Sequence, residues 1–272
     1  MNAVLKAIVG VAITATVMSG AYAAPLVDNY TLKLPGQTVT NIGALGFNGE
    51  TFINNTFAPN GDNFTFNDNG VFNVTTKNGG AGLLNFGQLT LDYRNGVGAG
   101  SLSGGSITFA AGGTLDIYYN PTKVYADAGA GANTGNRYGA ATGTKIATFT
   151  QLAGGGGFIN PNGTPSSNGD LTLLFQATDL ASGIWFDQDG KELKAGFTFG
   201  FVTTNASEDV NSIDPLLVET LTGSPATGSA PPDRFFVQNG GQLKVSAVPE
   251  PASLAIFGAG LLGLGALRRR KS

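Results

Sequence analysis

Short stretches in which hydrophobic and polar residues alternate run through most of the chain, separated by turns rich in Gly and Asn. The clearest example is residues 63–76, where Phe64 and Phe66 precede Asp68-Asn69-Gly70 and Phe72 follows it. Alternation with a period of two is typical of strands with one buried face, and Asn-Gly favours a tight turn. We therefore predict a β-hairpin over 63–76 that turns at 68–70.

Similar patterns predict further strands near residues 89–93, 107–109, 115–119, 146–152, 171–175, 197–201 and 236–245. Ala111-Gly112-Gly113 predicts a second hairpin between two of them. No stretch has the helical periodicity needed for a crossover between parallel strands. The pattern therefore predicts an all-β fold of at least ten strands, a single antiparallel β-sandwich or jelly-roll-like domain.

Segments dominated by small and turn-forming residues are expected to be surface loops. They cover residues 96–105, 125–143 and 220–232, and the four glycines at 154–157 predict a further flexible patch.

The first 23 residues have a different pattern from the body. Lys6 precedes an apolar stretch over 7–18, and Ala21 and Ala23 stand at positions −3 and −1 of a small-x-small cleavage site. This arrangement predicts a signal-peptide helix over 1–23 and a mature chain that begins at Ala24.

The last 25 residues contain three distinct parts. Val248-Pro249-Glu250-Pro251 precedes an apolar run, Ala252–Leu267, and four cations follow it: Arg268, Arg269, Arg270 and Lys271. Sixteen helical residues span about 24 Å, less than the ~30 Å hydrocarbon core. The pattern predicts a short transmembrane helix over 252–267, with the basic tail 268–271 held in the cytoplasm and the body outside.

These three parts, in this order, resemble the PEP-CTERM sorting signal of Gram-negative bacteria. The resemblance implies that exosortase, a membrane-embedded cysteine protease, cuts near Pro249-Glu250-Pro251 after the secretion translocon has exported the chain. The protein would be anchored transiently in the inner membrane and would then reach the cell surface or the extracellular matrix. The expected organisation is a signal peptide (1–23), a body (24–247) and a sorting signal (248–272).

Charge and composition exclude several functions for the body. Without Lys6, Glu250 and the four terminal cations, it holds 10 basic and 17 acidic residues, a net charge of about −7. Nucleic acid is not an expected partner, because phosphate binding draws on clustered Lys and Arg. The chain has no Cys and no His, which excludes Ser-His and Cys-His nucleophiles and His-bearing zinc sites. We expect no cofactor, and any catalysis would depend on carboxylates.

The densest carboxylates are Asp187, Asp189 and Glu192, around a Gly turn. They are a weak calcium candidate, because the Asp-x-Asp-Gly spacing matches only part of a calcium loop and a solvated turn explains it better. With Asp209 and Asp214, they are also the acidic groups that a glycosidase pair could use.

Aromatic residues offer a second kind of candidate. Phe197, Phe199 and Phe201 alternate on one strand face and are interpreted as core. The better candidates for stacking on sugars are Trp185, Tyr118, Tyr119, Tyr125 and Tyr138, although packing also accounts for them.

The Gly- and Phe-rich strand sequences of the body resemble those of the flocculation-associated PEP-CTERM group, chiefly over residues 104–119 and 168–173. That resemblance implies a non-enzymatic surface or matrix protein that promotes flocculation or biofilm formation through extracellular polysaccharide. The alternative is a secreted carbohydrate-active enzyme or carbohydrate-binding module that uses a carboxylate pair.

Overall fold

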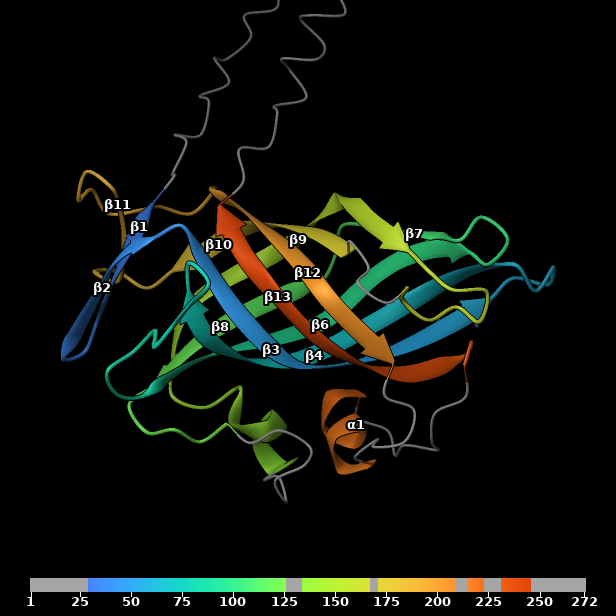
Figure 1. Ribbon diagram of the computed structural model, residues 1–272, viewed down its shortest axis with the longest axis horizontal. Helices are drawn as coiled ribbons and strands as arrows, with labels where there is room; N and C mark the ends of the chain where they lie inside the picture. Colours follow the sequence, from blue (N-terminus) through green and yellow to red (C-terminus); the bar gives the residue numbers. More distant parts are fainter. Residues whose placement is uncertain (1–28, 126–133, 167–170, 209–214, 223–230, 246–272) are drawn as a thin grey trace, which may run out of the picture. The chain divides into compact units, whose positions relative to one another are not determined.

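The computed structural model describes residues 29–125, 134–166, 171–208, 215–222 and 231–245 (Figure 1). The predicted signal peptide and the predicted sorting signal lie outside these residues. Among the described residues, no helix is both long and apolar enough to span a bilayer.

The described residues form strands for most of their length. In chain order they are β1 (Tyr30–Leu34), β2 (Gln37–Ile42), β3 (Ala44–Phe57), β4 (Asn63–Lys77), β5 (Gly80–Ala81), β6 (Gln88–Ser101), β7 (Ser106–Phe109), β8 (Thr114–Asn120), β9 (Thr144–Phe158), β10 (Leu171–Leu180), β11 (Trp185–Asp187), β12 (Thr198–Glu208) and β13 (Arg234–Val245). A 3₁₀ helix, η2 (Thr134–Gly139), and a short α-helix, α1 (Pro215–Thr222), accompany them. The predicted all-β class is confirmed.

Eight of the strands close into an antiparallel barrel. Around the ring they follow the order β3, β4, β6, β8, β9, β10, β12 and β13, and β13 pairs again with β3. The predicted sandwich or jelly roll is therefore replaced by one closed sheet. Glycines on the inner face permit this curvature: a Cβ at Gly49 would lie 2.1 Å from the carbonyl oxygen of Val71.

The predicted hairpin over 63–76 is wrong, because β4 is a single strand through Asp68-Asn69-Gly70. It pairs with β3 on one side and with β6 on the other, so the backbone has partners along its length. The pairing with β6 shifts register between Asp68 and Gly70, and Asn69 Oδ1 accepts a hydrogen bond from the backbone N–H of Asn95 (2.9 Å). The Asn-Gly pair is therefore not a turn: it lies opposite a β-bulge in β6, where Arg94 and Asn95 together face Asn69.

The second predicted hairpin is also wrong. β7 and β8 do not pair with each other. Each of them pairs with β6 on one side and with β9 on the other, and residues 110–113 separate them along the chain. The hairpin is formed by β6 and β7, so most of the expected loop 96–105 is strand. The glycines at 154–157 likewise belong to β9, and the last three of them pair with β10 or β7.

A small sheet of β2, β1 and β11 lies at one end of the barrel, on the left in Figure 1. Trp185 of β11 is fully buried, stacks on Tyr30 with ring centroids 5.8 Å apart, and donates a hydrogen bond from Nε1 to the carbonyl of Ile146 (2.8 Å). These side chains belong to the same apolar cluster as the barrel interior, so the small sheet closes this end.

Outside the barrel, η2 and α1 lie below the sheet in Figure 1. Val218 and Leu221 of α1 pack with Phe52, Phe236 and Tyr138 in a separate apolar cluster. Phe52 and Phe236 therefore face outward, and the helical segments cover this part of the wall.

Candidate functional site

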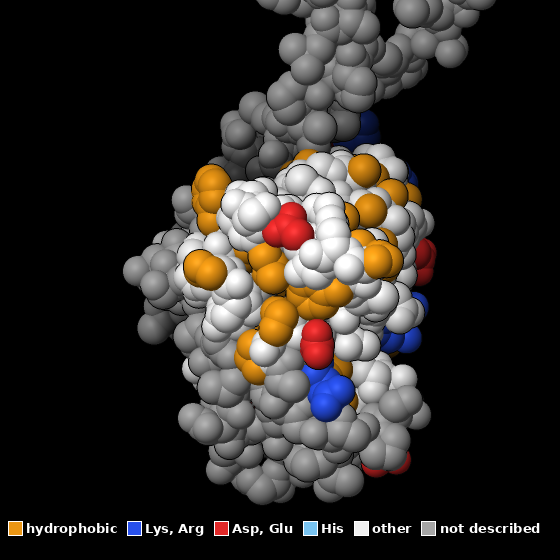
Figure 2. Space-filling view, turned by 90° about the vertical axis from the view of Figure 1, so that its right-hand side faces the viewer, with side chains coloured by type: hydrophobic (Ala, Val, Ile, Leu, Met, Phe, Trp, Pro, Cys, Tyr) orange, Lys and Arg blue, Asp and Glu red, His pale blue; other side chains and the backbone are white. Residues whose placement is uncertain are grey.

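The other end of the barrel, on the right in Figure 1, contains a cavity of ≈ 40 Å³. Figure 2 looks onto this end, where hydrophobic side chains gather near the middle of the face. The cavity is lined mainly by aromatic and aliphatic side chains: Thr51, Ile53, Asn55, Phe64, Phe66, Asp68, Phe72, Tyr93, Ile107, Phe109, Ile159, Gly163, Pro165, Leu171, Leu173, Phe175, Phe235 and Val237.

Asp68 is the one carboxyl group among the described residues that line this cavity. It shares the inner face of β4 with Phe64, Phe66 and Phe72, and its Oδ1 has no hydrogen-bond partner within the described part of the chain. Burial raises the pKa of Asp68 from 3.8 to about 7, because a charged carboxylate is poorly solvated there. At neutral pH, both protonation states are therefore populated.

Asn55 is a second polar group on the wall. It lies on β3, its Nδ2 donates a hydrogen bond to the carbonyl of Pro232 (2.6 Å), and its Oδ1 has no hydrogen-bond partner among the described residues. The cavity therefore contains two buried oxygen acceptors in an otherwise apolar lining.

Tyr93 does not provide the missing donor for Asp68. Its hydroxyl donates to Oε1 of Gln151, and Nε2 of Gln151 donates to the carbonyls of Val97 (2.9 Å) and Ala110. Burial, and then the charge of Asp68, raises the pKa of Tyr93 well above 10. Gln151 thus bridges the interruption between β7 and β8 and fixes the tyrosine.

A groove of ≈ 520 Å³ runs over the outer wall near the same end. Its polar side chains come from exposed or half-exposed positions on three strands: Asn54 and Thr56 of β3, Thr65 and Asn67 of β4, and Thr108 of β7. Val97, Gly98, Ala99 and Ala110 also line it, as do Phe66 and Phe109, which line the cavity too. The described lining is uncharged and offers hydroxyl and amide groups.

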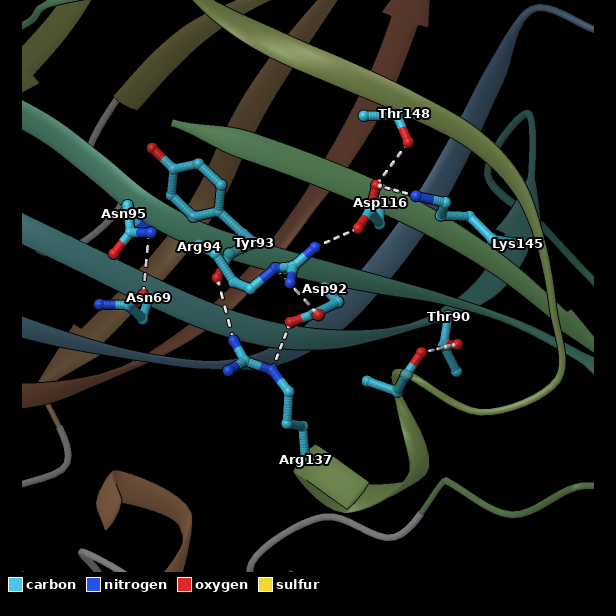
Figure 3. A network of polar contacts seen from close by, with 11 residues as sticks. Asn69, Thr90, Asp92, Tyr93, Arg94, Asn95, Asp116, Arg137, Lys145 and Thr148 are labelled. Atoms are coloured by element: carbon cyan, nitrogen blue, oxygen red, sulfur yellow. Dashed lines mark hydrogen bonds and ion pairs between the residues drawn. The ribbon is translucent and has the colours of Figure 1, made fainter. Parts of the chain in front are cut away.

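Two buried carboxylates lie on the outer wall, away from the cavity (Figure 3). Asp92 of β6 and Asp116 of β8 are register partners, and each side chain is 1% exposed. Arg94 forms ion pairs with both, Arg137 of η2 lies 2.5 Å from Asp92 Oδ1, and Lys145 lies 3.5 Å from Asp116 Oδ1. This network neutralises two like charges and attaches η2 to the barrel.

The carboxylates expected from the sequence lie in the turn after β11. Asp187 Oδ1 accepts hydrogen bonds from the backbone N–H groups of Asp189 (3.0 Å) and Lys191 (2.8 Å). Glu192 accepts from the backbone of Gly183 (2.6 Å), which is the main cause of its lowered pKa. These carboxylates stabilise a turn, and the described residues contain no cluster of three or more acidic side chains arranged to hold a metal.

Burial limits the aromatic candidates for sugar contact. Trp185, Tyr119 and Tyr138 are at most 2% exposed, so their rings cannot stack on a sugar at the surface. Tyr125 donates to the carbonyl of Val71 (3.3 Å), and Tyr118 is half-buried. Phe197 and Phe199 pack in the core as expected, and the side chain of Phe201 lies outside the described set.

The remaining predicted residues lie outside the described part of the chain. They are the cleavage pair Ala21 and Ala23, the processing residues Val248, Pro249, Glu250 and Pro251, the tail Arg268, Arg269, Arg270 and Lys271, and the acidic residues Asp209 and Asp214.

Asp68 and Asn55 were missed because the sequence assigned the first to a turn and gave the second no role. The signal was present in the register: Asp68 is an even number of residues from Phe64, Phe66 and Phe72, so a continuous strand places all four on one face. A carboxyl group in such a phenylalanine series indicates a buried charge.

Comparison with known proteins identifies one segment. Residues 247–271 match the PEP-CTERM protein-sorting motif. The motif implies export, membrane-associated sorting and processing by exosortase, so the protein acts outside the cell. Neither the curated proteins nor the solved structures contain a match to the chain.

Proposed function

We propose that this protein is a non-enzymatic surface or matrix protein of a Gram-negative bacterium that promotes flocculation or biofilm formation by binding extracellular polysaccharide. The observation that carries the proposal is the uncharged outer groove, which gathers threonine hydroxyls and asparagine amides from neighbouring strands. Such groups both donate and accept hydrogen bonds, as sugar hydroxyls do.

Strand register arranges these groups in two rows. Thr56 pairs with Thr65, Thr65 with Ala99, and Ala99 with Thr108. In the second row, Asn54 pairs with Asn67. Neighbouring strands lie about 4.8 Å apart, so the rows present closely spaced polar groups on a rigid sheet. A rigid sheet favours binding, because little backbone freedom remains to be lost.

Sorting supports the same function. The motif at 247–271 directs the body to the exterior, where the polysaccharide lies. One shallow groove gives a weak contact, but many copies on one cell or one polymer bind together through multivalency. Weak individual contacts are therefore sufficient for aggregation.

The processing step has its own test. Exosortase and the translocon are the proposed partners during export, and the segment 252–267 is the proposed transient anchor. Mass analysis of the mature surface protein should show a C-terminus near Pro249-Glu250-Pro251. Recovery of the intact tail to Ser272 from surface material would contradict processing.

The groove is tested by Thr65→Glu in the native host. The substitution places a charge in the middle of the first row, and Thr38→Glu, at an exposed position of β2, is the matched control. We expect the Thr65→Glu strain to settle more slowly and to retain less polysaccharide, and a strain lacking the gene should do the same. The Thr38→Glu strain should behave as wild type.

Unchanged settling, biofilm mass and polysaccharide retention in the deletion strain would overturn the proposal. Equal effects of the two Glu substitutions would show that the groove is not the polysaccharide-binding site. Release of reducing sugar when purified protein is incubated with the polymer would favour a carbohydrate-active enzyme instead.

A further inference from the structure

The barrel cavity contains two acceptors for which the described chain provides no donor. Oδ1 of Asp68 and Oδ1 of Asn55 are unpartnered there, and the two residues are 8% and 7% exposed. Buried polar groups in native proteins normally have partners, so two orphaned acceptors in one cavity indicate a molecule that brings its own donors.

The charge of Asp68 narrows the chemistry of that molecule. The described lining contains no Lys or Arg, so none of the described lining residues neutralises the carboxylate. An anion would be repelled, and a neutral molecule would leave the charge unpaired. A calcium ion requires six to eight oxygen ligands, more than one carboxylate and one amide provide.

The walls favour an organic cation. Seven lining residues are aromatic: Phe64, Phe66, Phe72, Tyr93, Phe109, Phe175 and Phe235. Phe66 and Phe109 meet edge to face with centroids 5.3 Å apart, as do Tyr93 and Phe175 at 5.6 Å. Aromatic faces attract cations and also pack against alkyl groups, so both parts of an alkylammonium ion find suitable contacts.

We propose that the barrel cavity binds a small organic ammonium ion, whose N–H groups donate to Asp68 and whose alkyl part lies among the phenylalanine rings. The site lies inside the barrel rather than on its outer wall, although Phe66 and Phe109 line both the cavity and the groove, and it does not depend on polysaccharide binding. A cavity that holds one water molecule needs roughly 10–15 Å³. The ≈ 40 Å³ cavity therefore suits an ion with few non-hydrogen atoms, such as n-propylammonium.

The test measures binding of n-propylammonium chloride to the full-length chain, purified in a nonionic detergent, by calorimetry at about pH 8. 1-Propanol is the neutral probe of the same size. We expect n-propylammonium to bind at least about tenfold more tightly, because only the ammonium pairs with the carboxylate. Asp68→Asn should remove that preference and leave propanol binding unchanged. Asp189→Asn, in the exposed turn, is the matched control and should retain the wild-type preference.

A pH series keeps the test decisive if Asp68→Asn does not fold. Asp68 and Tyr93 are the titratable groups among the described lining residues, and Tyr93 stays neutral because its pKa is raised well above 10. Since the ion requires ionised Asp68, with its pKa of about 7, its affinity should fall about 25-fold between about pH 7.5 and about pH 5.5. Equal affinity for the two probes, a pH-independent affinity, or no binding of n-propylammonium at tens of millimolar would each overturn the proposal.

Discussion

Asp68 and Asp92 lie on neighbouring strands of one barrel and are both more than nine-tenths buried, yet they face opposite sides of its wall. Asp92, on the outside, has Arg137 at 2.5 Å and Arg94 at 3.4 Å. Asp68, on the inside, has no ion pair within the described chain. Burial raises the pKa of both carboxyls, and the two arginines oppose that rise only at Asp92.

The difference separates two uses of a buried carboxyl group. Where the chain provides the counter-charge, the carboxylate holds segments together, as Asp92 attaches η2 to the barrel. Where it does not, the group weakens the fold at neutral pH and is available to a ligand. Burial alone does not distinguish these uses, whereas the identity of the nearest cation does.

Arg137→Met should have the largest effect on this comparison, because it makes the outer carboxylate resemble the inner one. The substitution keeps much of the side-chain volume, and within the described part of the chain it leaves the half-exposed Arg94 as the remaining ion-pair partner of Asp92. Removing one partner of a buried ion pair lowers the free energy of unfolding by about 3 kcal/mol. Urea unfolding of the full-length chain measures the loss, and Lys194→Met, at the exposed pair with Glu192, provides the control.

A double variant sharpens this result. If the loss arises from an uncompensated charge, replacing Asp92 by Leu together with Arg137→Met should recover part of the lost stability. A double variant that is less stable than Arg137→Met would mean that the network contributes mainly through its hydrogen bonds.

Asp68→Asn should have the next largest effect on the free energy of unfolding, and it should stabilise the protein. The pKa of Asp68 is raised in the folded state, so folding favours its protonated form, and stability should fall as pH rises from about 4 to about 7. The full cost of ionisation is about 4 kcal/mol by linkage, and the amide needs partners of its own, so we expect a gain of about 2 kcal/mol at about pH 8.

The measurement is the urea midpoint of Asp68→Asn and wild type across this pH range. The two should converge below about pH 4, where wild-type Asp68 becomes protonated in both the folded and the unfolded chain. Asp189→Asn should follow the wild-type curve. An Asp68→Asn protein that is less stable than wild type at about pH 8 would show that the carboxylate has a stabilising partner.

The sequence predicts the all-β class and most strand positions, because alternation reports which face of a strand is buried. It fails where a local signal and long-range pairing disagree. Asn69-Gly70 is typical of a hairpin turn, but partners on both sides of β4 hold it extended. Gly154 to Gly157 look flexible for the same reason, although they lie in β9 and the last three of them pair with β7 or β10.

Closure of the barrel could not be predicted, because it depends on pairings between distant strands such as β3 with β13. The cavity depends on that closure, so Asp68 and Asn55 could not be recognised as its lining. The sorting motif, by contrast, is a contiguous pattern, and residues 247–271 could be read directly from the sequence.

Lys145→Ala should have the smallest effect on the free energy of unfolding. It compares an exposed cation with a buried one, both next to the outer carboxylates. Lys145 is 44% exposed and lies 3.5 Å from Asp116 Oδ1, whereas Arg137 is 12% exposed and lies 2.5 Å from Asp92 Oδ1. Asp116 also pairs with Arg94 and accepts a hydrogen bond from Thr148 (2.6 Å), so it keeps partners without the lysine. Solvent screens the exposed ammonium, and we expect a change within about 0.5 kcal/mol in urea unfolding. A loss as large as that of Arg137→Met would mean that proximity to a buried carboxylate, rather than burial of the cation, determines the strength of these pairs.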